Sequence, residues 1–74
     1  MSTKRYHIYE GTRETREEGD RNLTLKEALR RAKYSVQTAK EMGYQNYVAH
    51  VIDTATGEFI HTEEFNFYDA QEAK

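Results

Sequence analysis

The chain contains neither cysteine nor proline, and few of its residues are hydrophobic. Without cysteine it has no disulfide framework and no thiolate metal site. Without proline it has no rigid linker. Hydrophobic residues make up 36% of the 74 residues, below the usual globular share of about 45–50%, so the core must be thin. Six tyrosines and three phenylalanines help to fill it, because each buries a large area.

Long apolar runs are also missing. No run approaches the roughly 18 apolar residues that a membrane-spanning helix needs, and the N-terminus lacks the apolar stretch of a signal peptide. We therefore expect a cytoplasmic protein. The length suits one small domain, residues 1–74, and is too short for two. A domain of this size buries only about 60–65% of the surface of its unfolded chain, so its stability should be marginal.

The segment 24–43 has the signals of one complete amphipathic helix. Thr24 and Glu27 have the spacing of a capping box, and Gly43 suits the left-handed residue that ends a helix. At 100° per residue, one arc of the helix collects the apolar side chains Leu25, Ala28, Leu29, Ala32, Val36 and Ala39. Three of the six are alanines, which predicts that the helix lies close to a sheet.

Three segments have the composition of strands: 4–10, 47–53 and 58–65. Between the last two, 54–57 has the layout of a type I turn followed by a left-handed glycine. In the register that follows, Ile52 lies opposite Ile60. The sequence thus predicts an α+β fold of β-α-β-β order, a single antiparallel or mixed sheet with the helix on one face. It leaves the position of the first strand open.

The segment 10–22 has no apolar side chain and leaves two interpretations open. The first is a charged, solvated loop. The second is a polar edge strand over 12–16, since loops of this length without structure are uncommon in small domains and charged edges resist aggregation. The tail, 66–74, carries Phe67 and Tyr68, which either dock on the sheet or fray with a mobile tail.

The sequence gives little support for a catalytic or metal-binding site. In the predicted register His50 and His61 point to opposite faces of the sheet, and His7 is out of phase with its own strand, so the three histidines do not converge on a zinc ion. Glu63 and Glu64 are adjacent in a strand and point apart, which prevents a paired acid and base. We expect no enzyme activity, no metal and no cofactor.

The charge distribution is more informative than the net charge of −2. The helix segment carries five basic residues against two glutamates, and 53–74 carries six acids against one lysine. Basic and polar side chains form a stripe beside the apolar arc of the helix. In the predicted register three aromatic side chains also share one sheet face. These eight residues are the candidate partner-binding residues: Lys26, Arg30, Lys33, Gln37 and Lys40 on the stripe, and Tyr47, Phe59 and Phe65 on the sheet.

The layout resembles that of several small phage-encoded inhibitors of bacterial defence, which implies a protein that acts by occluding the surface of a partner. We therefore expect a small non-enzymatic protein-binding module, an inhibitor or adaptor of a phage or bacterial accessory kind. The alternative is a nucleic-acid-binding module, because the basic stripe suits a phosphate backbone. A homodimer that pairs through a sheet edge or face is a third interpretation.

Overall fold

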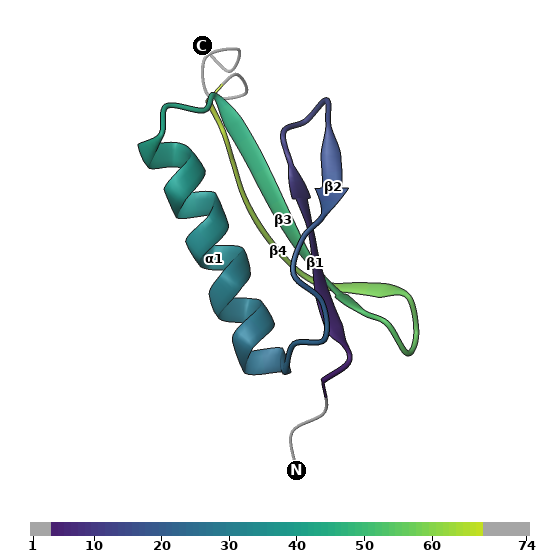
Figure 1. Cartoon of the computed structure of the whole chain (residues 1–74). Helices are drawn as coiled ribbons and strands as arrows, with labels where there is room; N and C mark the ends of the chain where they lie inside the picture. The colour runs from purple at the N-terminus through teal and green to yellow at the C-terminus, as the bar shows by residue number, and fades with distance from the viewer. Residues whose placement is uncertain (1–3, 68–74) are drawn as a thin grey trace.

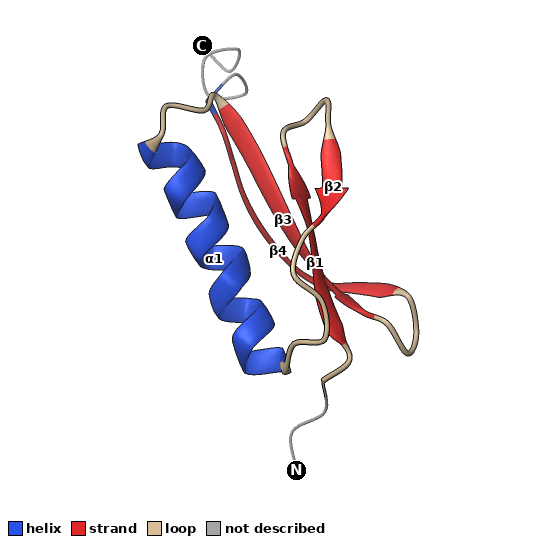
Figure 2. Cartoon of the chain, viewed as in Figure 1, coloured by secondary structure: helices blue, strands red, loops and turns tan. Residues whose placement is uncertain are grey.

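The computed structural model describes residues 4–67, which form a four-stranded antiparallel sheet with one helix across one face (Figure 1). The elements are β1 (Tyr6–Gly11), β2 (Arg16–Glu18), α1 (Leu25–Glu41), β3 (Asn46–Asp53) and β4 (Glu58–Asn66), and the strand order is β2-β1-β3-β4 (Figure 2). The predicted α+β class is confirmed. The chain order is β-β-α-β-β rather than β-α-β-β, and β1 pairs with β3.

The ends of α1 follow the sequence signals. The Glu27 amide donates to the Thr24 hydroxyl at 3.1 Å, and the Thr24 amide donates to the Glu27 carboxylate at 2.9 Å, which completes the capping box. The bond from the Thr24 amide is the largest cause of a lowered pKa at the Glu27 carboxyl. Gly43 follows the last turn with a φ of 91°. The predicted helix boundaries are therefore confirmed.

The segment 10–22 contains a short edge strand, so its interpretation as a loop throughout is wrong. Strand β2 pairs with β1 as Glu10↔Glu17 and Gly11↔Arg16. It begins later than the 12–16 that we predicted, because a tight turn closes first: the Thr12 amide donates to the Thr15 carbonyl at 2.9 Å. A Cβ on Gly11 would lie 2.0 Å from that carbonyl oxygen, so the turn needs glycine there.

The β3–β4 hairpin has the predicted loop but a different register beside it. Asp53 pairs with Glu58 and Ile52 with Phe59, whereas Val51 pairs with His61 as predicted. The four-residue loop closes on Asp53, and the ladder then shifts by one residue, so that Ile60 is the extra residue of a bulge. Phe59 is therefore on the same face as Ile52, opposite to the face that we predicted for it.

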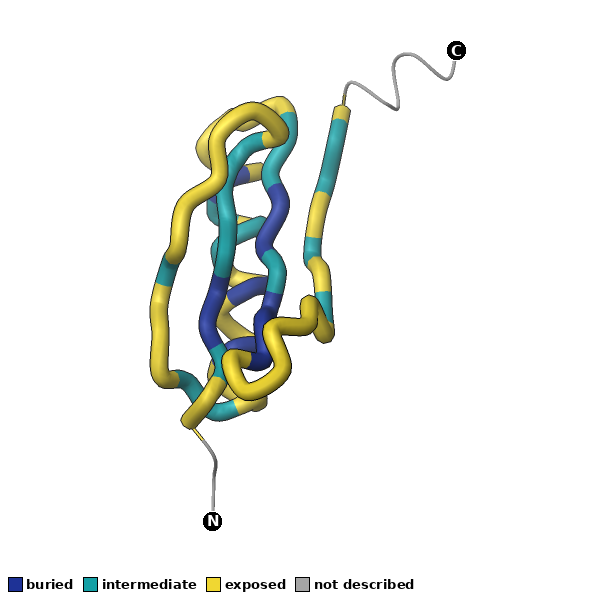
Figure 3. The backbone as a smooth tube through the Cα atoms, turned by 90° about the vertical axis from the view of Figure 1, so that its right-hand side faces the viewer, coloured by how far each residue is buried: buried dark blue, intermediate teal, exposed yellow. Residues whose placement is uncertain are grey.

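The core lies between α1 and the two central strands. It consists of Ile8 on β1, Ala49 and Val51 on β3, and the helix residues Ala28 and Ala32, each at most 1% exposed. Figure 3 shows buried and intermediate residues along the central strands β1 and β3, whereas β4 has only exposed and intermediate residues. One residue of the predicted apolar arc, Leu25, is 41% exposed, so it contributes little to this core.

Two further predictions concern the tail and the membrane. Of the predicted tail 66–74, the structure describes Asn66 and Phe67; Tyr68 and the residues after it lie outside the described residues. The Phe67 ring lies 5.1 Å from the Phe65 ring, so the described part of the tail continues the line of β4. Within residues 4–67 there is no helix with the length and apolar character needed to cross a membrane.

Candidate protein-binding site

The predicted stripe is exposed along one side of α1. Lys26, Arg30, Lys33, Gln37 and Lys40, which we call the basic flank, are all exposed. None of them takes part in the salt bridges found within residues 4–67. Lys40 has a different partner, since its ammonium group lies 5.8 Å from the centre of the Phe67 ring. The other three cations of the basic flank, Lys26, Arg30 and Lys33, form no salt bridge or ring contact among the described residues.

A groove separates the basic flank from β4. Its volume is about 410 Å³, and its lining consists of Lys26, Leu29, Arg30 and Lys33 from α1 with His61 and Glu63 from β4. Since Lys40 lies beside Phe67 at the far end of β4, the helix and β4 run in the same direction. We call this feature the α1–β4 groove. The sequence predicted its helix wall, but not that β4 forms the other wall.

The strand wall of the groove contains a hydrogen-bonded pair of side chains. His61 Nε2 lies 2.5 Å from the Glu63 carboxylate, and both side chains are half-buried. They are two residues apart on β4, so they lie on the same face of the sheet. Glu63 is therefore engaged within its own strand rather than with the lysines opposite. The cations of the helix wall form no salt bridge with Glu63, so they can meet an incoming group.

The three aromatic candidates do not form one surface. Tyr47 and Phe65 are directly paired across β3 and β4, on the face that α1 covers. Phe59 is on the other face because of the bulge, which corrects the predicted Tyr47/Phe59/Phe65 surface. Tyr47 is also occupied, since its hydroxyl donates to the Glu10 carboxylate at 3.3 Å. The aromatic part of the predicted site is thus split between two faces.

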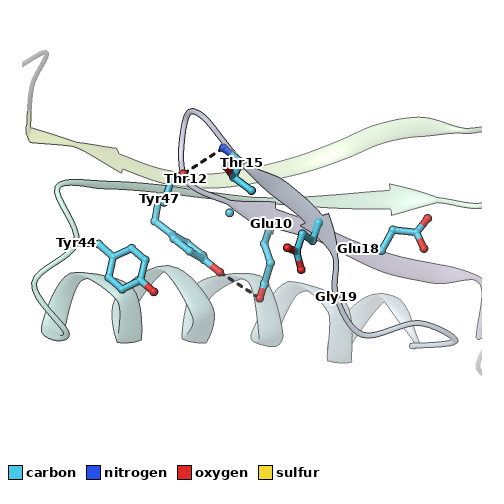
Figure 4. A pocket seen from close by; sticks show the side chains of 9 residues that line it. Glu10, Thr12, Thr15, Glu18, Gly19, Tyr44 and Tyr47 are labelled. Carbon is cyan, nitrogen blue, oxygen red and sulfur yellow. Dashed lines mark hydrogen bonds between the residues drawn. The ribbon is translucent and has the colours of Figure 1, made fainter.

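Figure 4 shows a second, acidic pocket around Tyr47, with a volume of about 280 Å³. Tyr44 packs edge-on against Tyr47 with 5.5 Å between ring centres, and Glu10 and Glu17 come from paired positions on β1 and β2. Burial, and then the charge of Glu10, raise the pKa of Tyr47 to about 12. This pocket has the opposite sign to the basic flank.

On the face away from α1, Phe59 joins an aromatic cluster that the predicted register missed. The Phe59 ring lies 4.6 Å from the His50 ring and 6.4 Å from the Tyr9 ring. His50 Nδ1 lies 2.9 Å from the Thr62 hydroxyl, while its Nε2 is buried without a hydrogen-bond partner. Burial, followed by the charge of Arg16, lowers the pKa of His50. Sequence periodicity cannot show this cluster, because the bulge reverses the side of Phe59.

The histidines do not form a metal site in the part of the chain that the structure describes. His50 and His61 point to opposite faces, as predicted. Residues 4–67 contain no group of three or more His, Cys, Asp or Glu side chains that could hold a metal ion.

Comparison with known proteins gives no relative: no family model, no curated protein and no solved structure matches this chain.

Proposed function

We propose that this protein is a small non-enzymatic module that binds another protein through the α1–β4 groove, as an inhibitor or adaptor that covers part of its partner's surface. One observation carries the proposal. Lys26, Arg30 and Lys33 line a groove together with the apolar side chain of Leu29, and they form no salt bridge among residues 4–67. Protein interfaces combine an apolar, arginine-enriched centre with a polar rim, and Leu29 and Arg30 between two lysines suit this arrangement.

The charges of the groove favour an acidic partner. Complementary potentials speed the encounter of two proteins and fix their relative orientation. Another part of the surface has the opposite sign: the Figure 4 pocket presents Glu10, Glu17 and Glu18. An acidic protein is therefore attracted to one part of the domain and repelled by another, which supports a single mode of docking.

Nucleic acid is the alternative ligand, and two features argue against it. No Phe, Tyr or Trp side chain lines the groove within residues 4–67, so it lacks the large aromatic rings on which bases stack. The chain also has a net charge of −2, and the acidic pocket repels a long phosphate backbone. A protein partner with a local acidic patch does not meet this repulsion.

The test is a capture experiment with a charge-reversed protein. The wild type and an Arg30→Glu/Lys33→Glu variant are immobilised and exposed to nuclease-treated lysate of the source cells, and bound proteins are identified by mass spectrometry. We expect a partner that the wild type retains and the variant loses. Both residues are exposed, so the substitutions should change the unfolding free energy by no more than about 0.5 kcal/mol each.

The matched control is Arg13→Glu/Arg21→Glu, which reverses two exposed arginines away from the groove. This control should retain the partner, because the total charge changes equally but the groove does not. Equal capture by all three proteins would refute the proposal. Binding of the wild type to labelled RNA or DNA, with a steep salt dependence that the groove variant flattens, would establish the nucleic-acid alternative.

A further inference from the structure

Strand β4 has an open edge along the α1–β4 groove. In the order β2-β1-β3-β4 it pairs on one side with β3, and no strand within residues 4–67 pairs with its other side. We propose that this edge accepts an extended acidic segment of the partner protein, which joins the sheet as a fifth strand beneath the basic flank. The inference rests on the proposed function and specifies how the partner binds. Such strand addition supplies affinity through backbone hydrogen bonds and specificity through alternate side chains.

The backbone ladder shows which groups of β4 face outward. Both backbone groups of Tyr6 bond to Leu23, on the side of β1 away from β3. Tyr6 and its partner Asp53 on β3 are therefore a non-hydrogen-bonded pair. The N–H and C=O groups of Asp53 point away from β1, toward β4. Backbone N–H and C=O groups point to alternate sides along a strand, so those of Val51 also point to β4. The backbone groups of its partner His61, and those of Glu63 two residues on, therefore point to β3. The N–H and C=O groups of Thr62 and Glu64 consequently point to the open edge.

The spacing of the basic flank matches that of a strand. Lys26, Arg30 and Lys33 extend over about 10 Å of the helix axis at about 1.5 Å per residue. Side chains on one face of a strand recur at intervals of about 6.7 Å. A strand beside β4 thus places two successive side chains of one face under these cations. Acidic side chains at every second position suit this geometry.

The opposite face requires a different chemistry. Thr62 and Glu64 have their side chains on the face away from α1. An incoming segment with acids on that face as well would meet the charge of Glu64. The sequence that fits is therefore an alternating one, acidic toward the helix, where the three cations of the basic flank outnumber the single carboxylate of Glu63, and uncharged toward the other face. The glutamates of β4 also disfavour a second copy of this chain, because like charges would meet across a β4–β4 pair.

Synthetic peptides test the alternation directly. A fluorescein-labelled peptide of about eight residues, with Glu and Val alternating, is compared with one of equal composition in blocks of two, Glu-Glu-Val-Val. Fluorescence anisotropy should show binding of the alternating peptide about tenfold tighter, since the block peptide loses one or two ion-supported contacts. Equal affinity for the two peptides would refute the alternation and reduce the interaction to charge attraction.

Backbone methylation tests the added strand itself. Two further alternating peptides carry N-methyl groups, one on all Glu residues and one on all Val residues. Only one edge of the added strand bonds to β4, so one methylated peptide should lose binding and the other retain it. Loss with methyl-Val indicates an antiparallel segment, because residues opposite Thr62 bond to it; loss with methyl-Glu indicates a parallel one. Retention by both, or loss by both, would overturn strand addition.

A pair of protein variants completes the test. Glu64→Pro removes an outward N–H from the edge, whereas Glu64→Ala removes the same charge and keeps the N–H. Thermal unfolding establishes that both are folded. Glu64→Pro should bind the alternating peptide about tenfold more weakly than Glu64→Ala, because one or two hydrogen bonds are lost. Equal binding, or a dimer of the free protein that Glu64→Pro dissociates, would refute the partner strand.

The two proposals fail in different ways. If capture of a partner depends on Arg30 and Lys33 but the alternating peptide binds no better than the block peptide, the protein-binding function stands and strand addition is wrong. If charge reversal leaves capture unchanged, the groove is not the binding site and both proposals fail. If the alternating peptide binds and Glu64→Pro weakens it, strand addition is supported even before a cellular partner is known.

Discussion

The packing of α1 against the central strands, where the buried core lies, yields the sharpest prediction. Ala32 is fully buried against Ile8, Ala49 and Val51, each at most 1% exposed. Leucine at position 32 adds the equivalent of about three methylenes, worth about 2.4 kcal/mol in stability if space were available for them. No such space is expected in a packed interior, where added volume costs about 1–3 kcal/mol. The gain from burial would raise the free energy of unfolding, whereas the cost of overpacking would lower it.

Urea unfolding followed by circular dichroism measures this sign. Ala32→Leu should lower the midpoint with little change in the slope, which means lost stability rather than a changed denatured state. In a thermal scan the same loss lowers the melting temperature by about 4–8 °C per kcal/mol. Gln37→Leu introduces the same leucine side chain on the exposed basic flank. Its unfolding free energy should stay within about 0.5 kcal/mol of the wild-type value. An Ala32→Leu protein that is more stable than the wild type would refute the close helix–sheet contact.

Three more predictions follow from the caps, the turn and the histidine cluster. Thr24→Ala should cost about 1 kcal/mol, because it removes the acceptor of the Glu27 amide, and a urea midpoint equal to that of the wild type would show that the capping box adds nothing. Gly11→Ala should destabilise the protein more than Gly43→Ala in the same assay, because a Cβ at position 11 would lie 2.0 Å from a carbonyl oxygen and one at 43 has no atom within 4 Å. Burial lowers the pKa of His50 in the folded state, so folding favours its neutral form; its contribution is present above the unfolded value of about 6.5 and is lost as the pH falls through the folded value. His50→Gln should therefore lose less stability than the wild type between neutral and mildly acidic pH, and equal losses would contradict this cause.

The sequence predicts the elements well where local chemistry decides them. Thr24, Glu27 and Gly43 specify the ends of α1 through bonds within four residues of each other, so no distant contact can override them. The loop 54–57 is specified in the same way, and its Gly57 has the expected positive φ of 77°. Elements of this kind are readable because their energetic cause is contained in the segment itself.

The predictions fail where a distant partner or a single extra residue decides the outcome. Strand β2 has no apolar side chain, and it is held by backbone bonds to β1 that no periodicity reveals. The Phe59 side is determined by the bulge at Ile60, because one inserted residue reverses the face of everything between it and the turn. Likewise the basic flank was visible from helical spacing, whereas its pairing with His61 and Glu63 depends on the strand order.

The small core also explains why a groove exists on this side of the helix. The alanines of α1 rest on β1 and β3, and no residue of β4 belongs to the buried core cluster. The helix packs chiefly against β3 and also approaches both β1 and β4, so the long side chains of the basic flank line the groove beside β4. Lysine and arginine keep their charged ends in water and do not fill the space beneath them. Beside this thin core, β4 has an open edge and the cations of the basic flank lie above it. The proposed binding depends on these two features.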